Sequence, residues 1–196
     1  MPISNKIAHQ YLSPLERLPT WVICIPLTIQ WLYLALRYRS ATLPSVANPK
    51  ITSGGLVGEG KLEYFQDMGS IASAATASHC AIHTDKSHSI DQLRQQMAGA
   101  NLTFPVIAKP NLGLCGYGVR LIANEQELEN YVSSFPKNEV IVLQEYLAED
   151  GEAGIFYARH PDEKKGQIIG LTLRYYPHVI GDGINTIDQL IAANSR

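Results

Sequence analysis

Residues 104–119, FPVIAKPNLGLCGYGV, decide the fold of this 196-residue chain. A β-prone run from Phe104 to Pro110 leads into a glycine-rich loop, and a second β-prone run extends from Tyr117 to Ile122. The segment therefore predicts a β-hairpin with Lys109 near the end of its first strand. Three glycines are expected at the tip of this hairpin: Gly113, Gly116 and Gly118.

A lysine beside a glycine-rich loop has the chemistry of a polyphosphate clamp. The ammonium group supplies positive charge, and glycines let backbone N–H groups approach phosphate oxygens without obstruction by side chains. Glycines also serve ordinary turns, so a purely structural turn is the alternative. The pattern is neither the G-x-G-x-x-G of a dinucleotide-binding fold nor the G-K-[ST] ending of a P-loop.

The segments on either side of this hairpin alternate between helical and β patterns. Helices are expected at about 62–68, 90–98 (capped by Ser89), 125–134 (capped by Asn124) and from Thr186 onward. A further strand is expected at 140–145, and a second hairpin should pair residues 154–159 with 167–174. This order predicts an α+β fold, with helices packed on an antiparallel sheet. We place its boundary near residue 55, so that residues 1–54 form an apolar N-terminal segment and linker and residues 55–196 the domain.

Taken together, residues 58–196 resemble the ATP-grasp superfamily, in the manner of D-alanine:D-alanine ligase and cyanophycin synthetase. The resemblance implies an antiparallel ATP-grasp sheet in which Lys109 contacts the phosphates of ATP and the loop from Gly113 to Gly118 folds over them. The segment GEGKLEYFQDMG, residues 58–69, is similar to the family's first lysine at the head of a helix. It implies Lys61 as the second phosphate ligand, and Lys86 in TDKSHS is the competing candidate.

Glu145, Tyr146, Leu147 and Glu152 resemble the family's adenine hinge and ribose-binding acid. The resemblance implies that backbone groups of Tyr146 and Leu147 pair with the adenine edge, that Glu145 accepts from the adenine amino group, and that Glu152 accepts from ribose hydroxyls. Two glutamates at an exposed strand end are the structural alternative.

Arg174, in LTLRYYPHVIGDGINTIDQLI, resembles a catalytic arginine that precedes a V-x-G-D-G-x-x-T-I turn in the family. Its guanidinium could hold a phosphate or a substrate carboxylate with two hydrogen bonds, and a surface strand position is the alternative. The family's acidic Mg²⁺ ligands and asparagine lie beyond the part of the fold seen here, and no such cluster follows Arg174. We therefore expect a fragment, with Mg²⁺ held chiefly by nucleotide oxygens or by a missing half.

The implied activity is that of an ATP-dependent ligase. Such an enzyme activates a small carboxylate with ATP and Mg²⁺ as an acyl phosphate, and an amine or thiol then displaces the phosphate. The alternative is a non-catalytic, membrane-associated nucleotide-binding module.

The segment from Trp21 to Leu36 is almost wholly apolar and is followed by Arg37 and Arg39. Its length falls short of the ~20 apolar residues of a typical membrane span, and Pro26 lies near its middle. Tryptophan, tyrosine and arginine suit a headgroup boundary, so a membrane-surface anchor over residues 21–39 is one interpretation. A buried helix and a true span are the other two.

Composition adds two expectations. The formal net charge of −2 and pI near 6.3 give no electrostatic basis for nucleic-acid binding. The three scattered cysteines indicate a reducing, cytoplasmic setting, with the inner face of the membrane as a further location.

Residues 79–88 hold three histidines and a cysteine, which we interpret as solvated side chains in a polar connection rather than as metal ligands.

Overall fold

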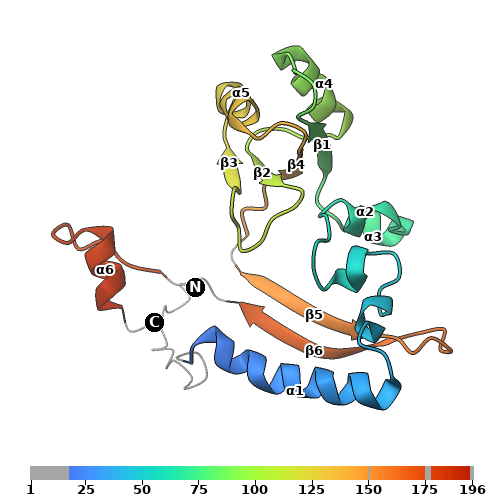
Figure 1. Ribbon diagram of the computed structural model, residues 1–196. Coiled ribbons are helices and arrows are strands. Elements are labelled where there is room, and N and C mark those ends of the chain that lie inside the picture. Colours follow the sequence, from blue (N-terminus) through green and yellow to red (C-terminus); the bar gives the residue numbers. More distant parts are fainter. Residues whose placement is uncertain (1–17, 150, 175–177, 195–196) are drawn as a thin grey trace, which may run out of the picture. The chain divides into compact units, whose positions relative to one another are not determined.

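The computed structural model describes residues 18–149, 151–174 and 178–194 (Figure 1). Contacts divide the chain into two compact units. One consists of residues 30–148, and the other combines residues 1–29 with 149–196.

The larger unit is built on a four-stranded antiparallel sheet. Its strands are β1 (His79–His83), β2 (Val106–Pro110), β3 (Arg120–Ile122) and β4 (Val140–Glu145), in the order β1-β4-β2-β3. In the pairing of β2 with β4, Lys109 lies opposite Val142 and Ile107 lies opposite Gln144. The hairpin of β2 and β3 confirms the one predicted around the glycine-rich loop.

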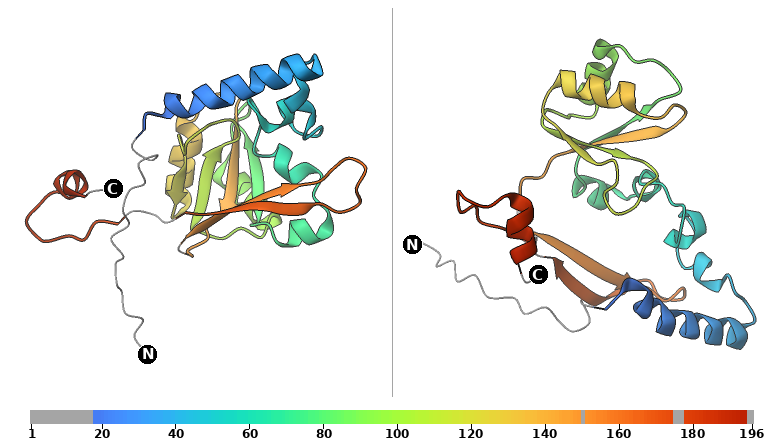
Figure 2. Two further views of the ribbon diagram at one scale, coloured as in Figure 1. Left: turned by 90° about the horizontal axis from the view of Figure 1, so that it is seen from below. Right: turned by 60° about the vertical axis from the view of Figure 1, so that its left-hand side comes forward.

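Helices α4 (Ile90–Gly99) and α5 (Glu125–Ser134) cover one face of this sheet (Figures 1 and 2). Because side chains alternate along a strand, every second residue of β2 and β4 points toward these helices. The fully buried core consists of alternating strand residues and apolar helix residues: Ile82, Leu93, Val106, Ala108, Leu128, Ile141 and Leu143. Residues of the other register, including Lys109 and Gln144, lie on the opposite face.

Both helices begin at the predicted caps. The Ser89 hydroxyl accepts from the backbone of Gln92, whose side chain accepts in return from the Ser89 backbone, which completes a capping box. Asn124 accepts from the backbone of Glu127 at the start of α5. Caps of this kind contribute about 1 kcal/mol each, so local sequence fixes where these helices begin.

Two short helices, α2 (Glu63–Gln66) and α3 (Ser70–Ala74), lie between residue 60 and the first strand. Phe65 of α2 stacks on His79 of β1, with ring centroids 3.9 Å apart. Residues 79–83 form a strand, and the interpretation of this stretch as a polar connection was therefore wrong. The surrounding histidines and polar residues hide the period-2 pattern, because β1 lies at the edge of the sheet and only Ile82 is buried completely.

The smaller unit contains an antiparallel hairpin of β5 (Glu152–Ala158) and β6 (Gln167–Arg174), followed by helix α6 (Ile187–Ala193). The predicted hairpin is confirmed, with one register shift between Phe156 and Tyr157. Thr186 and Gln189 form the predicted capping box of α6. Before it, the Asp182 carboxylate accepts from the backbone of Asn185 and Ile184, and these hydrogen bonds lower the pKa of Asp182 to about 2.

The apolar N-terminal segment forms helix α1 (Thr20–Tyr38), as its composition predicted. Two 3-10 helices follow, η2 (Leu43–Val46) and η3 (Thr52–Gly55). The Trp31 indole donates to the Ala41 carbonyl at 3.1 Å, which ties the end of α1 to the following turn. In the part of the chain that the structure describes, no helix is both long enough and apolar enough to cross a membrane.

Candidate functional site

Two lysines meet on the sheet face that α4 and α5 leave open. Lys109 is the fourth residue of β2, and Lys61 lies just before α2, 48 positions earlier in the chain. The Lys61 ammonium donates to the carbonyls of Asn111 and Gly113, at 3.3 and 3.2 Å, and so lies at the start of the glycine-rich loop. The structure thus brings Lys61 to the end of the strand that carries Lys109.

Asn111 holds the head of α2 in this position. Its carbonyl accepts from the Lys61 backbone at 3.0 Å, and its side chain accepts from the Leu62 backbone at 2.9 Å. Gly60 permits this close approach, since a β-carbon there would lie 2.7 Å from the Asn111 side chain. Sequence reasoning did not single out Asn111. Its position two residues after Lys109, between a proline and the glycine loop, is the signal that could have drawn attention to it.

Gln144 was also missed, although the alternation in VIVLQE places it on the same face as Lys109. Its side-chain oxygen accepts from the Lys109 ammonium at 2.5 Å, and its side-chain nitrogen donates to the Ala77 carbonyl at 3.3 Å. In the sheet it lies between Ile107 and His79. A neutral side chain thus orients the Lys109 ammonium without neutralising its charge.

The electrostatics of the pair favour an anion. Burial lowers the pKa of Lys109, and the neighbouring positive charge of Lys61 lowers it further. Burial also lowers the pKa of Lys61, partly offset by Glu59. Among the described residues, no ion pair joins either lysine to a carboxylate. Two partly desolvated cations in one place repel each other, and a polyphosphate would relieve that repulsion.

The glycine-rich loop has the backbone conformation that its glycines predict. Gly116 and Gly118 have φ of 74° and 75°, in the left-handed region that favours glycine. At Gly118 a β-carbon would also lie 2.8 Å from the Pro110 ring. The Tyr131 hydroxyl of α5 donates to the Gly118 carbonyl at 2.7 Å, which anchors one end of the loop. Leu114 and Tyr117, between the ends, are 77% and 86% exposed, so this part of the loop is available to cover a ligand.

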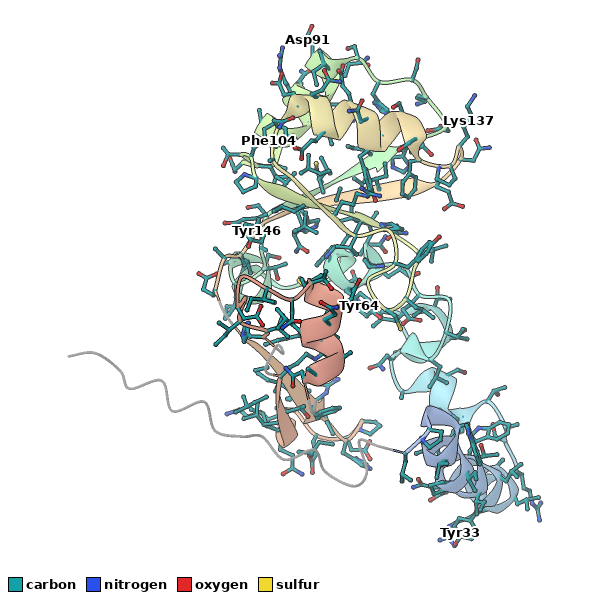
Figure 3. The ribbon with its side chains drawn as sticks, turned by 90° about the vertical axis from the view of Figure 1, so that its left-hand side faces the viewer. Tyr33, Tyr64, Asp91, Phe104, Lys137 and Tyr146 are labelled. Atoms are coloured by element: carbon teal, nitrogen blue, oxygen red, sulfur yellow. The ribbon has the colours of Figure 1, made fainter. Side chains whose placement is uncertain are left out.

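The predicted hinge follows the end of β4. Glu145 accepts from the Ser78 backbone at 3.2 Å, and its own backbone donates to the Ser78 carbonyl, so it extends the pairing of β4 with the residue before β1. Tyr146 (Figure 3) and then Leu147 continue from it without regular structure, and both side chains are exposed. Backbone groups outside a strand ladder are available to a ligand, and the purine-binding role of these residues stays a prediction.

Glu152 and Arg174 belong to the smaller unit, where they face each other across the β5–β6 hairpin. They are register partners, and the Arg174 guanidinium donates to the Glu152 carboxylate at 3.1 Å. Two residues to which the resemblance gives separate roles thus form an exposed ion pair. Their placement at one purine and phosphate site with Glu145 and Lys109 stays a prediction.

Lys86, the competing candidate, lies in the connection between β1 and α4. It is exposed and lines a surface depression of about 300 Å³ together with Ser87, His88 and three glutamines of α4. Geometry therefore favours Lys61 over Lys86 as the partner of Lys109.

In the described ranges no group of three or more His, Cys, Asp and Glu side chains is placed to hold a metal ion.

The antiparallel sheet has helices on one face and, on the other, a lysine pair at the start of a glycine-rich loop, an arrangement suited to a polyphosphate. Residues 72–157 match the family model of the RimK-like ATP-grasp domain. This match agrees with the resemblance to the N-terminal part of an ATP-grasp fold that the sequence motifs carry. The match includes Lys109, the glycine-rich loop, the segment from Glu145 to Leu147 and Glu152, while Lys61 and Arg174 lie outside it.

Two curated relatives are the glutathione biosynthesis bifunctional protein GshAB of Streptococcus agalactiae serotype V and its counterpart from serotype III. Each is 27% identical over 96 residues, which cover 47% of this chain. The same match covers 12% of the relative, so the chain corresponds to a small part of those proteins. No solved structure matches the chain.

Proposed function

We propose that this chain is the ATP-binding portion of an ATP-dependent ligase that joins a carboxylate to an amine or a thiol through an acyl phosphate. The observation that carries the proposal is the Lys61–Lys109 pair, in which two partly buried ammonium groups repel each other and neither forms an ion pair with a carboxylate among the described residues. The ATP-grasp match over residues 72–157 supports ATP as the anion that occupies this place.

The chain's own residues would have distinct roles in binding the phosphates and in excluding water. Lys109, oriented by Gln144, and Lys61, positioned by Asn111, would bind the β- and γ-phosphates and stabilise the negative charge that shifts during phosphoryl transfer. The Gly113–Gly118 loop would donate backbone N–H groups and exclude water from the reactive acyl phosphate. No covalent bond to the protein is needed.

Residues after β4 would bind the nucleoside. Backbone groups of Tyr146 and Leu147 would pair with the adenine edge, and Glu152 would accept from the ribose hydroxyls. Arg174, which pairs with Glu152 across the hairpin, would hold a phosphate or the carboxylate of the substrate. A relative named for glutathione biosynthesis agrees with a small carboxylate as the substrate.

Magnesium, when bound with the nucleotide, would supply further charge neutralisation at the phosphates. The described residues offer no cluster of three or more acidic, histidine or cysteine side chains for it, and we assign it no ligand from this chain. Because the proposed chemistry consumes ATP, we also propose the cytoplasm as the compartment where the protein works.

Two measurements test the proposal. Calorimetry of the 196-residue chain should give saturable binding of Mg-ATP and much weaker binding of Mg-AMP, which lacks the phosphates that the lysines would contact. Binding of AMP as tight as that of ATP would contradict the site. For the reaction, the chain is incubated with Mg-ATP, hydroxylamine and a panel of small carboxylates. Hydroxamate together with ADP supports an acyl phosphate, whereas AMP and pyrophosphate would refute that route.

A further inference from the structure

Helix α1 exposes large apolar side chains around most of its circumference. Trp21, Ile25, Ile29, Leu32 and Leu36 follow the spacing i, i+4, i+8, i+11 and i+15, which places them on one face. They are between 48% and 81% exposed. Leu27 and Trp31, at other positions around the helix, are 58% and 44% exposed. A helix that is apolar nearly all round needs an apolar environment to cover it.

The polar side chains Thr28, Gln30 and Arg37 leave most of the surface of α1 apolar. The Thr28 hydroxyl donates to the Cys24 carbonyl at 2.8 Å, so it needs no water. Gln30 and Arg37 are seven residues apart, two turns of the helix, and share one sector. Figure 3 shows side chains projecting from α1, with Tyr33 pointing away from the helix.

Charge is segregated in the same region. Between Glu16 and Glu59 the sequence has no acidic residue, and it has four basic ones, Arg17, Arg37, Arg39 and Lys50. This stretch therefore carries a formal charge of +4 in a chain whose net charge is −2. Lys50 pairs with Asp67, while Arg37 and Arg39 flank Tyr38 at the end of α1, with the Arg37 guanidinium 5.7 Å from the centre of its ring.

We propose that α1 is a membrane-surface anchor that lies in the interface of an anionic bilayer, with its apolar sides in the acyl region and Arg37 and Arg39 at the headgroups. Basic charge without acidic neighbours favours an anionic lipid surface over the apolar face of a protein. Tryptophan and tyrosine at the two ends of the helix, Trp21 and Tyr38, belong at the headgroup boundary. The inference is independent of the nucleotide site.

Flotation of the full chain with vesicles tests the anchor. The protein should float with vesicles of phosphatidylcholine mixed with phosphatidylserine and much less with phosphatidylcholine alone. Binding to the mixed vesicles should weaken at about 1 M salt, where the Debye length is about 3 Å. Arg37→Glu/Arg39→Glu should weaken binding at least about thirtyfold, because each basic residue at an anionic surface contributes about fivefold.

The apolar contribution is tested with Ile29→Glu/Leu36→Glu, which should weaken binding about a hundredfold or more. The matched control is Ile71→Glu/Ile184→Glu, which makes the same change at side chains that are 88% and 89% exposed outside α1. Lys164→Glu/Lys165→Glu is the control for the arginine variant. Both control proteins should float as the wild type does.

Several results would overturn the anchor. They are an absence of wild-type flotation, binding that ignores lipid charge and salt, or α1 variants that float like their controls. Resistance of the bound protein to alkaline carbonate extraction would show a span instead of a surface helix. A soluble oligomer that Ile29→Glu/Leu36→Glu dissociates, without vesicle binding, would show that protein covers α1.

Discussion

Replacing Lys109 by methionine should remove most of the affinity for Mg-ATP while leaving the fold intact. Methionine keeps much of the apolar stem, which is half-buried beside Val142, but lacks the ammonium. A charge-assisted hydrogen bond contributes about 1.5–3 kcal/mol, and partial burial of Lys109 reduces screening by water. We therefore expect the dissociation constant for Mg-ATP to rise about tenfold to a hundredfold.

The assay is isothermal titration calorimetry of wild type, Lys109→Met and Lys86→Met with Mg-ATP and with adenosine. Lys86 is the matched control, an exposed lysine that the sequence also offered as a phosphate ligand. Only Lys109→Met should lose affinity for Mg-ATP, and adenosine binding should change little in either variant. Thermal unfolding without nucleotide checks that both variants fold. Wild-type affinity in Lys109→Met, or an equal loss in Lys86→Met, would refute the phosphate site.

Four further predictions concern this lysine and the loop beside it. Lys61→Met should raise the pKa of Lys109 toward its ordinary value of 10.5 without restoring it fully, because burial is the larger cause of the shift; NMR titration of labelled lysine Nζ measures this. In the free protein, the pKa of Lys109 lies below that of an exposed lysine. Mg-ATP affinity should therefore fall as pH rises through that lowered pKa, because Lys109 loses its charge. An affinity that stays constant up to pH 10.5 would contradict this prediction. Asn111→Ala should release the head of α2, because the Asn111 side chain accepts from the Leu62 backbone; Mg-ATP binding should weaken by about 1–2 kcal/mol and the pKa of Lys109 should rise, and unchanged binding and pKa would remove the positioning role of Asn111. Gly118→Ala should lower the free energy of unfolding in urea by about 1–3 kcal/mol more than Gly116→Ala does. Both glycines have positive φ, but only at Gly118 would the added carbon lie 2.8 Å from a proline ring. Equal losses of unfolding free energy would show that a small shift relieves the contact.

Local patterns in the sequence were enough for most elements of the fold. Ser89, Asn124 and Thr186 predicted the starts of three helices, because a side chain that caps a helix acts within three residues of its own position. The glycines after Lys109 predicted a turn, because positive φ is a property of single residues. Strand β1 was missed, because an edge strand with one fully buried residue carries little period-2 signal.

By itself, the sequence determined the α+β class, the hairpin around Lys109, the ATP-grasp resemblance and the apolar helix α1. Only the tertiary structure decided that Lys61, and not Lys86, lies beside Lys109, that Gln144 and Asn111 position the two ammonium groups, and that Glu152 pairs with Arg174. The physical reason is the separation along the sequence between the residues that interact. Caps, turns and hydrophobic period depend on residues a few positions apart, whereas the neighbours of a charged side chain depend on strand register and on which distant segment covers each face of the sheet.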